Sequence, residues 1–242
     1  MLDVRNVTGG YAQETPVIHN INFDVRAQEI VGLIGMNGAG KSTILKTILG
    51  LLPPHEGTVM IDGVMLEQDP VAFRSKIAYI PETPKLYDEL TLWEHMELTA
   101  MVYKIDEKTF RARAERLLGI FRMSEQVDAF PGTFSKGMQQ KVMILCAFLV
   151  EPALFIVDEP FVGLDPLAIQ SLLELLTEMR EQGASVLIST HILATAERYC
   201  DRFVLINRGH VALHGTMDEM REQAKMPGAM LDEMFVKVVH ER

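Results

Sequence analysis

The chain has 242 residues, which is enough for one large domain or two small ones with a substantial hydrophobic core. Its formal net charge of −10 argues against a nucleic-acid-binding protein, because neutralising phosphates requires a stripe of Lys and Arg. Cys146 and Cys200 lie in apolar surroundings and are expected to be buried thiols in a reducing cytoplasm, with no disulfide or metal site. The longest apolar runs, such as residues 142–150, are well below the roughly 20 residues of a membrane span, and no signal peptide is expected.

The first functional pattern along the chain is a glycine-rich segment between a strand and a helix. Residues 30–34, IVGLI, predict a buried strand, and residues 42–49 predict a helix. Between them, GMNGAGKST matches the phosphate-loop pattern G-x-x-x-x-G-K-[ST]. The expected nucleotide contacts are consecutive in the sequence: Gly35, Met36, Asn37, Gly38, Ala39, Gly40, Lys41, Ser42 and Thr43. A glycine-rich turn that binds nothing is the alternative, which the flanking strand and helix disfavour.

This loop has the chemistry of a triphosphate site. Its backbone amides would turn inward around the phosphates, and the helix N-terminus would add a partial positive charge. Lys41 would reach the β and γ phosphates, and the Ser42 hydroxyl would be a ligand of Mg²⁺. The loop therefore predicts ATP and Mg²⁺ as ligands.

A helical stretch separates this loop from the next buried strand. Residues 76–80, KIAYI, predict a strand, and LWEHMELTAMVY and EKTFRARAERLLGIF then have apolar residues at three- and four-residue spacing. These segments predict amphipathic helices inserted into the β-rich part of the chain. Residues 134–141, FSKGMQQK, begin a further apolar helix, and taken alone this segment is typical of a plain helix cap.

The second buried strand carries the acidic part of the site. Residues 153–157, ALFIV, predict a strand that delivers Asp158 and Glu159 at its carboxyl end, where open α/β sheets place their chemistry. Asp158 would orient Mg²⁺, and Glu159 would polarise a water that attacks the γ phosphate. The alternative is an Asp-Glu-Pro turn that caps the following helix. His191 ends another apolar run, ASVLIST, and is expected close to the same phosphate.

Taken in this order, the motifs make the chain resemble the nucleotide-binding subunits of ABC transporters. Several residues of FSKGMQQK fit the family's LSGGQQ-type signature: Ser135, Gly137, Gln139 and Gln140. The family's D-loop is matched by Gly163, Leu164, Asp165 and Pro166, and its switch histidine by His191. The segments EPFVGLDPLAI and STHILATAERYCD are similar to those of the Ecs-type exporter ATPases of Gram-positive bacteria.

The resemblance implies a mechanism that needs two copies of the chain. In this family two subunits sandwich two ATP molecules head to tail, so the signature of one subunit faces the phosphate loop of the other. The residues expected to contact ATP across that dimer are Ser135, Lys136, Gly137, Met138 and Asp165. Tyr11 sits where the family places an aromatic that stacks on adenine.

The resemblance also implies the partners and the location. A separate polytopic permease subunit would carry the membrane spans and choose the exported substrate, no nucleic acid would be bound, and this chain would lie at the cytoplasmic face of the cell membrane. Three residues depart from the family pattern. Glu82 stands where the family has Gln, and Lys136 and Met138 stand where its signature has Gly and Gln. Glu82 is expected to approach both Mg²⁺ and the attacking water, which predicts slow ATP hydrolysis by the isolated subunit.

The resemblance predicts an α/β phosphate-loop NTPase of the ABC ATPase type. Its mostly parallel core sheet would be joined by an antiparallel β subdomain and interrupted by an inserted helical subdomain. Residues 1–242 would form a single nucleotide-binding domain: a core with the β subdomain at 1–85 and 146–215, a helical subdomain at 86–145 and a C-terminal helical tail at 216–242.

Two other functions remain as alternatives. The first is an ABC ATPase that remodels a macromolecular complex, such as a ribosome or DNA, without transport. Such proteins usually carry two cassettes or a long coiled coil, whereas this chain has one cassette with about 50 residues between Glu82 and the signature. The second is a module that holds ATP without hydrolysing it, which the presence of Glu159 and His191 disfavours.

Overall fold

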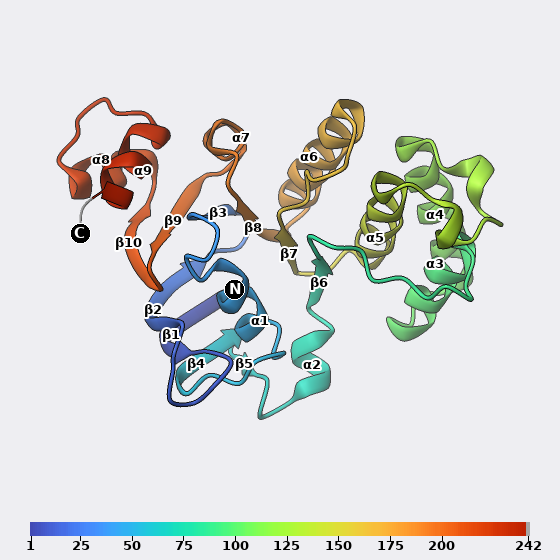
Figure 1. Cartoon of the computed structure of the whole chain (residues 1–242). Helices are drawn as coiled ribbons and strands as arrows, with labels where there is room; N and C mark the ends of the chain where they lie inside the picture. The colour runs from blue at the N-terminus through green and yellow to red at the C-terminus, as the bar shows by residue number, and fades with distance from the viewer. Residues whose placement is uncertain (241–242) are drawn as a thin grey trace.

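The computed structural model describes residues 1–240, and the last two residues of the predicted tail lie outside this range. Two β-sheets form the body of the molecule, and a group of three helices, α3, α4 and α5, lies to one side of it (Figure 1). The fold combines parallel and antiparallel sheets with covering helices, as the sequence predicts for an α/β protein.

The N-terminal part of the chain forms a four-stranded antiparallel sheet. Its strands, in spatial order, are β2 (Ile18–Val25), β1 (Leu2–Gly9), β4 (Glu56–Ile61) and β5 (Val64–Met65). Ile21, Phe23 and Val25 alternate with more exposed residues along β2, so one face of the sheet is buried and the other is accessible to water. The short helix α2 (Pro70–Arg74) follows this sheet and is capped by Asp69.

The larger sheet has six strands, five of them parallel. Their spatial order is β10 (His210–Gly215), β9 (Arg202–Asn207), β3 (Ile30–Ile34), β8 (Ser185–Thr190), β7 (Leu154–Asp158) and β6 (Ile77–Ile80). Only the edge strand β10 runs antiparallel to its neighbour, β9. Every residue of β3, β7 and β8 is buried, because helices or the antiparallel sheet cover both faces.

Three helices form the insertion between β6 and β7. They are α3 (Leu92–Val102), α4 (Glu107–Phe121) and α5 (Lys136–Val150), with short 3₁₀ turns at Ser124–Gln126 and Pro131–Thr133. The helix α5 is continuous to Val150, so the predicted boundary between residues 145 and 146 falls inside it. Its last turn stays helical because Ala147, Phe148 and Leu149 are all buried.

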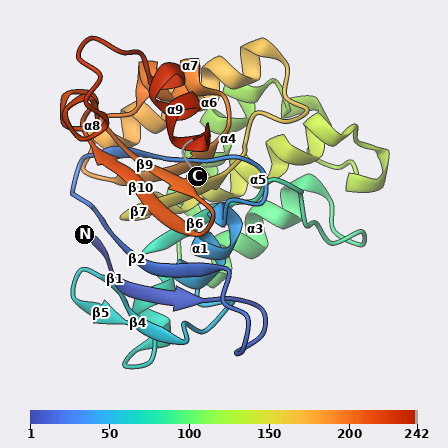
Figure 2. The ribbon, with the colours of Figure 1, turned by 60° about the vertical axis from the view of Figure 1, so that its left-hand side comes forward.

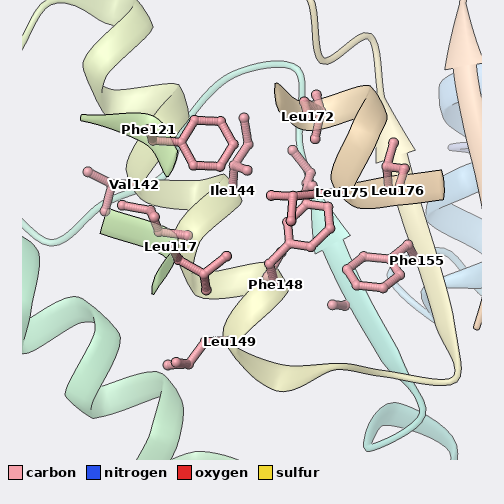
Figure 3. Close-up of a cluster of buried hydrophobic side chains, with 14 of the residues drawn as sticks. Leu117, Phe121, Val142, Ile144, Phe148, Leu149, Phe155, Leu172, Leu175 and Leu176 are labelled. Atoms are coloured by element: carbon pink, nitrogen blue, oxygen red, sulfur yellow. The ribbon is translucent and has the colours of Figure 1, made fainter. Parts of the chain in front are cut away.

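The helical insertion is joined to the sheet by one hydrophobic core. Figure 3 shows Leu117 and Phe121 of α4, Phe148 of α5, and Phe155 of β7 within the same buried cluster. The helix α6 (Pro166–Glu181) adds Leu172, Leu175 and Leu176 to it. The ring centroids of Phe148 and Phe155 lie 4.8 Å apart, with an angle of 33° between the ring planes, so α5 packs directly on β7.

The opposite face of the sheet contacts the phosphate-loop helix. The helix α1 (Lys41–Ile48) buries Ile44, Leu45 and Ile48 between the two sheets. A third cluster connects α7 (Leu193–Tyr199) and the C-terminal helices α8 (Met217–Ala224) and α9 (Leu231–His240) to β9 and β10 (Figure 2). None of the helices within residues 1–240 is long and apolar enough to cross a membrane.

Both cysteines are free thiols set among apolar residues. Burial raises the pKa of the Cys146 thiol to about 11, and it also raises the pKa of Cys200, to which the charge of Asp201 adds. Both thiols are therefore protonated at neutral pH and behave as small apolar side chains.

Candidate active site

Four neighbouring strands of the parallel sheet end at one edge, and each delivers part of the predicted site. The strand β3 leads into the phosphate loop, β8 into His191, β7 into Asp158 and Glu159, and β6 into Pro81 and Glu82. Consecutive parallel strands β3, β8, β7 and β6 bring these segments together because their carboxyl ends all point the same way.

A pocket of about 430 Å³ lies at this edge. Its lining is Tyr11, Val17, Met36, Asn37, Gly38, Gly40, Lys41, Ser42, Thr43, Glu82, Glu159 and His191. Most of the residues that the sequence points to for one nucleotide site therefore surround a single cavity. Gly35 and Ala39 are buried within the loop itself. Val17 was not predicted, since nothing in its sequence neighbourhood distinguishes it from any residue at the start of a strand.

The phosphate loop turns sharply into α1 at Gly40. This residue has φ of 113°, in the left-handed region, and a Cβ there would lie 2.9 Å from Cγ2 of Ile18. No side chain caps α1, so its first backbone amides stay available to an anion. The Lys41 amine donates to the carbonyl oxygen of Gly35 at 2.8 Å and lies 3.4 Å from that of Met36. The loop therefore holds its own lysine in place.

Glu159 is held between two residues of the site. Its Oε1 lies 3.5 Å from Nζ of Lys41, and its Oε2 lies 2.7 Å from Nδ1 of His191. The backbone N–H of His191 also donates to Oε2, at 3.3 Å. The backbone of Glu159 has φ of 44°, and its N–H donates to the carbonyl oxygen of Ser189 at 2.9 Å. A left-handed conformation is unusual for a Glu and is typical of functional sites.

Asp158 is a buried carboxylate beside other acidic groups. Its Oδ1 has no hydrogen-bond partner within the described chain. Burial raises the pKa of Asp158, and the nearby charges of Glu82 and Glu159 raise it further. The Ser189 hydroxyl and the charge of Lys41 lower it. An unpartnered buried oxygen among carboxylates is an environment that a bound cation would relieve.

Tyr79 lies near the same carboxylates on β6. Burial raises its pKa to about 12, and the charges of Asp158 and Glu82 add to that shift. The phenol therefore stays neutral at physiological pH. Among residues 1–240, no group of three or more His, Cys, Asp or Glu could hold a metal on its own, so a cation here would need oxygens from a phosphate or from water.

Tyr11 forms the outer wall of the pocket and is 63% exposed. The Lys46 amine donates to its hydroxyl at 3.0 Å and lies 5.2 Å from the ring centroid. The hydrogen bond from Lys46 lowers the pKa of Tyr11. Lys46 holds the Tyr11 ring in place, and the open face of this ring is suited to stacking on a flat aromatic ligand.

The signature residues lie elsewhere on the molecule. Ser135 is the N-cap of α5 and accepts a hydrogen bond from the N–H of Met138 at 3.3 Å, and Lys136 is exposed. Asp165 caps α6 in the same way, accepting from the N–H of Ala168 at 2.9 Å. None of the five residues predicted to contact ATP across a dimer lines the pocket of the phosphate loop.

Comparison with known proteins agrees with this geometry. The ABC transporter family model matches residues 18–162. The ABC-type transporter ATP-binding protein EcsA of Bacillus subtilis is 54% identical over all of this chain and 97% of its own length. A solved ATP-binding subunit of an ABC transporter superposes with a TM-score of 0.96 at 51% identity, covering 98% of this chain and 99% of that one.

A further solved structure bears on the reaction. The dimeric post-hydrolysis state of the ATP-binding cassette MJ0796, bound to ADP and Pi, has a TM-score of 0.81 at 28% identity, over 90% of this chain and 99% of that one. The fold defines a phosphate-loop ATPase of the α/β class. Within that class, the chain belongs to the ATP-binding domains of the ABC transporter family, and it is an ATPase.

Proposed function

We propose that this chain is the ATP-hydrolysing subunit of an exporter, working as a head-to-tail dimer on a separate polytopic permease at the cytoplasmic face of the membrane. The observation that carries the proposal is the separation of the two halves of the predicted site. The phosphate loop and Glu159 line one pocket, whereas Ser135 and Asp165 lie outside it. A second copy in the head-to-tail arrangement would bring the missing half to each pocket.

Within one pocket, the residues divide the work between binding and hydrolysis. Lys41 and the loop amides hold the phosphates, and Tyr11 stacks on the adenine. Ser42, Asp158 and Glu82 are the residues that would hold Mg²⁺, and the unpartnered oxygen of Asp158 fits such an ion. Bound Mg²⁺ would neutralise charge on the β and γ phosphates.

Glu159 accepts a proton from the attacking water. Its contact with His191 fixes the direction of the carboxylate, so one oxygen can face the water while the other keeps the histidine. When ATP arrives, Lys41 exchanges its contact with Glu159 for one with the phosphates, and this frees the carboxylate. His191 is exposed at the rim of the pocket, where it can respond to loss of the γ phosphate.

The partner copy would supply the opposite half of each site. Ser135 and the amides of Lys136, Gly137 and Met138 stand at the N-terminus of α5, which offers partial positive charge to a γ phosphate. The short Gly163–Asp165 turn lies directly beside that helix end. Phosphoryl transfer depends mainly on positioning and charge stabilisation, which is what such groups provide.

The permease would bind beside α3. Tyr87, Met101 and Val102 are exposed apolar residues on or next to this helix. Solvent-facing apolar groups of this kind are suited to a protein partner. Trp93 is half-buried and packs on the core of the insertion: its ring centroid lies 4.9 Å from that of Phe110, and its N–H donates to Glu97 at 2.7 Å.

The proposal is tested by co-purification and by nucleotide-driven assembly. The chain carrying Glu159→Gln, mixed with ATP and Mg²⁺, should elute as a dimer and return to a monomer when the nucleotide is removed. The wild-type chain, isolated from membranes under mild detergent, should bring with it one polytopic membrane protein. Recovery with ribosomes or DNA instead would show that the chain serves a macromolecular complex and does no transport.

A further inference from the structure

Two adjacent residues near the start of α5 reach two different functional segments. The side-chain amide of Gln140 donates from Nε2 to the carbonyl oxygen of Pro81 at 2.9 Å. Gln140 is only 1% exposed, so water does not compete for this bond. Pro81 immediately precedes Glu82, which lines the nucleotide pocket. The inserted helix is therefore tied to the loop that carries Glu82.

The amide of Gln140 has one unsatisfied atom. Its Oε1 is buried and has no hydrogen-bond partner among the residues described. Burying an unpaired acceptor is unfavourable, and an apolar side chain of similar size would avoid that loss. An apolar side chain could not, however, donate the hydrogen bond to the carbonyl oxygen of Pro81. The next amide, Gln139, donates to the carbonyl oxygen of Pro131 at 3.0 Å, and that bond stays within the insertion.

Lys141 reaches the other segment. Its Nζ lies 3.1 Å from Oδ2 of Asp165, and the lysine side chain is 15% exposed. The other oxygen of Asp165 accepts from the N–H of Ala168 and caps α6. The pKa of Asp165 is lowered by that N–H and by Lys141, so the aspartate is ionised and the ion pair is complete at neutral pH.

A backbone contact brings the same two segments together. A Cβ at Gly137 would lie 2.3 Å from the carbonyl oxygen of Gly163, so only glycine fits at this position of α5. The first two turns of α5 thus touch the turn before α6 through Gly137 and hold it through Lys141. Successive side chains of a helix point about 100° apart, so Gln140 and Lys141 can reach two different neighbours, Pro81 and Asp165.

We propose that Gln140 and Lys141 are positioning residues that fix the Glu82 loop and the Asp165 turn to one rigid helix. A shift of the helical insertion then moves Glu82 in its own pocket and Asp165 on the dimer face together. In a head-to-tail dimer these segments serve different ATP sites, so α5 links the two sites; this part of the inference rests on the proposed function. Neither residue lines the nucleotide pocket, and both act through the group that they hold.

The first test concerns Gln140. Gln140→Met removes the donor and keeps the size of the side chain, so backbone amides of residues 82–90 should exchange with deuterium roughly tenfold faster, and kcat for ATP should fall roughly 10- to 100-fold with little change in KM. Gln139→Met is the matched control and should leave exchange in residues 82–90 at the wild-type rate. In a Glu82→Ala background, Gln140→Met should lower kcat no further.

The second test concerns Lys141. Lys141→Gln should speed exchange in residues 161–168 and lower kcat, and Lys141→Arg should restore both, because it keeps the positive charge. Combined with Asp165→Asn, Lys141→Gln should add no further loss of kcat. Thermal melts and ATP affinity of the monomer check that each variant is folded and binds normally.

Several results would overturn the proposal. Wild-type exchange in both loops would show that the contacts hold nothing in place. Additive losses of kcat in the double variants would show that Gln140 and Lys141 do not act through Glu82 and Asp165. If kcat falls only in proportion to a lowered melting temperature, and Lys141→Arg does not restore it, both residues stabilise the fold and do not position the loops. The ATP-driven dimer of the Glu159→Gln chain reports on the proposed function separately.

Discussion

At the scale of single residues, Lys41 and Glu159 lie in contact, and the proposed function gives them different roles: binding of ATP and its hydrolysis. Lys41→Ala should abolish ATP binding, because Lys41 lines the pocket and is proposed to hold the phosphates in the ground state. Glu159→Gln should still bind ATP, and its hydrolysis should fall by about 10² to 10⁴, because an amide cannot accept the proton of the attacking water. Calorimetry measures the binding, and release of phosphate measures the rate.

The exposed Glu115→Gln, on the outer face of α4, is the matched control and should hydrolyse ATP like the wild type. Wild-type rates for Glu159→Gln would mean that another group acts as the base. Unchanged ATP affinity in Lys41→Ala would mean that the backbone of the loop is sufficient for binding.

Asp158 allows a prediction about pH. Burial, with Glu82 and Glu159, raises its pKa above the value in the unfolded chain. Between the two pKa values the native state holds a proton that the unfolded chain has lost, so this group's contribution to the free energy of unfolding falls as pH rises through that window and stays lost above it. Asp158→Asn cannot ionise and should raise the free energy of unfolding at neutral pH, by on the order of 1 kcal/mol in the nucleotide-free protein.

Thermal or urea unfolding at a series of pH values checks this. The gain of Asp158→Asn over the wild type should be smallest below the unfolded pKa, at about pH 3, and largest at about pH 7. ATP hydrolysis should be lost in the same variant, as is common where a functional site is kept at the expense of stability. A gain that does not change with pH would exclude ionisation of Asp158 as its cause.

At the scale of secondary-structure elements, the contact between α5 and β7 couples the insertion to the sheet. Phe148→Ala should lower the free energy of unfolding by about 3–5 kcal/mol, since it leaves a cavity in the core drawn in Figure 3. Phe155→Ala should act similarly, and the double variant should lose less than the sum by about 0.5–1.5 kcal/mol because the two rings contact each other. Urea unfolding curves give these values.

Phe130→Ala is the control at this scale. Phe130 is half exposed, so its removal should change stability by no more than about 0.5 kcal/mol. Losses in the double variant equal to the sum of the single losses would show that the two rings contribute independently.

At the scale of the whole molecule, the proposed head-to-tail dimer predicts that two inactive variants restore activity when they are mixed. Ser135→Arg should leave ATP binding to the monomer unchanged, because Ser135 lies outside the pocket of its own phosphate loop. It should suppress hydrolysis and ATP-driven dimerisation, since the bulky cation would occupy the partner's site. Mixed with Lys41→Ala, it forms a dimer in which one site is damaged twice and the other is intact.

The mixture should therefore hydrolyse ATP faster than either variant alone, measured as phosphate release over a range of mixing ratios. The control mixes a chain that carries both Ser135→Arg and Lys41→Ala with a chain that carries Glu159→Gln. This dimer has no intact site and should stay inactive. A tenfold weaker ATP affinity of the Ser135→Arg monomer would place the signature in its own subunit's site and exclude the sandwich.

Local patterns in the sequence were sufficient for the fold class, for the family, and for several core elements such as β3, β6, β7 and the helices α3 and α4. The reason is that buried strands of a parallel sheet are short apolar runs, and the chemistry follows them directly. Lys41 comes after β3, and Asp158 and Glu159 come at the end of β7, so their neighbourhood could be predicted from order alone. Roles assigned to individual site residues remain predictions.

Tertiary structure alone decided which distant residues meet. Val17 joins the pocket, Lys46 holds Tyr11 from 35 positions away, and Gln140 holds Pro81 from 59 positions away. The end of α5 at Val150, beyond the boundary predicted at residue 145, was likewise decided by burial against β7 and α6. The periodicity of apolar residues indicates which face of a helix or strand is buried. The residues that this face contacts depend on how all the elements pack together, and no local sequence pattern specifies that packing.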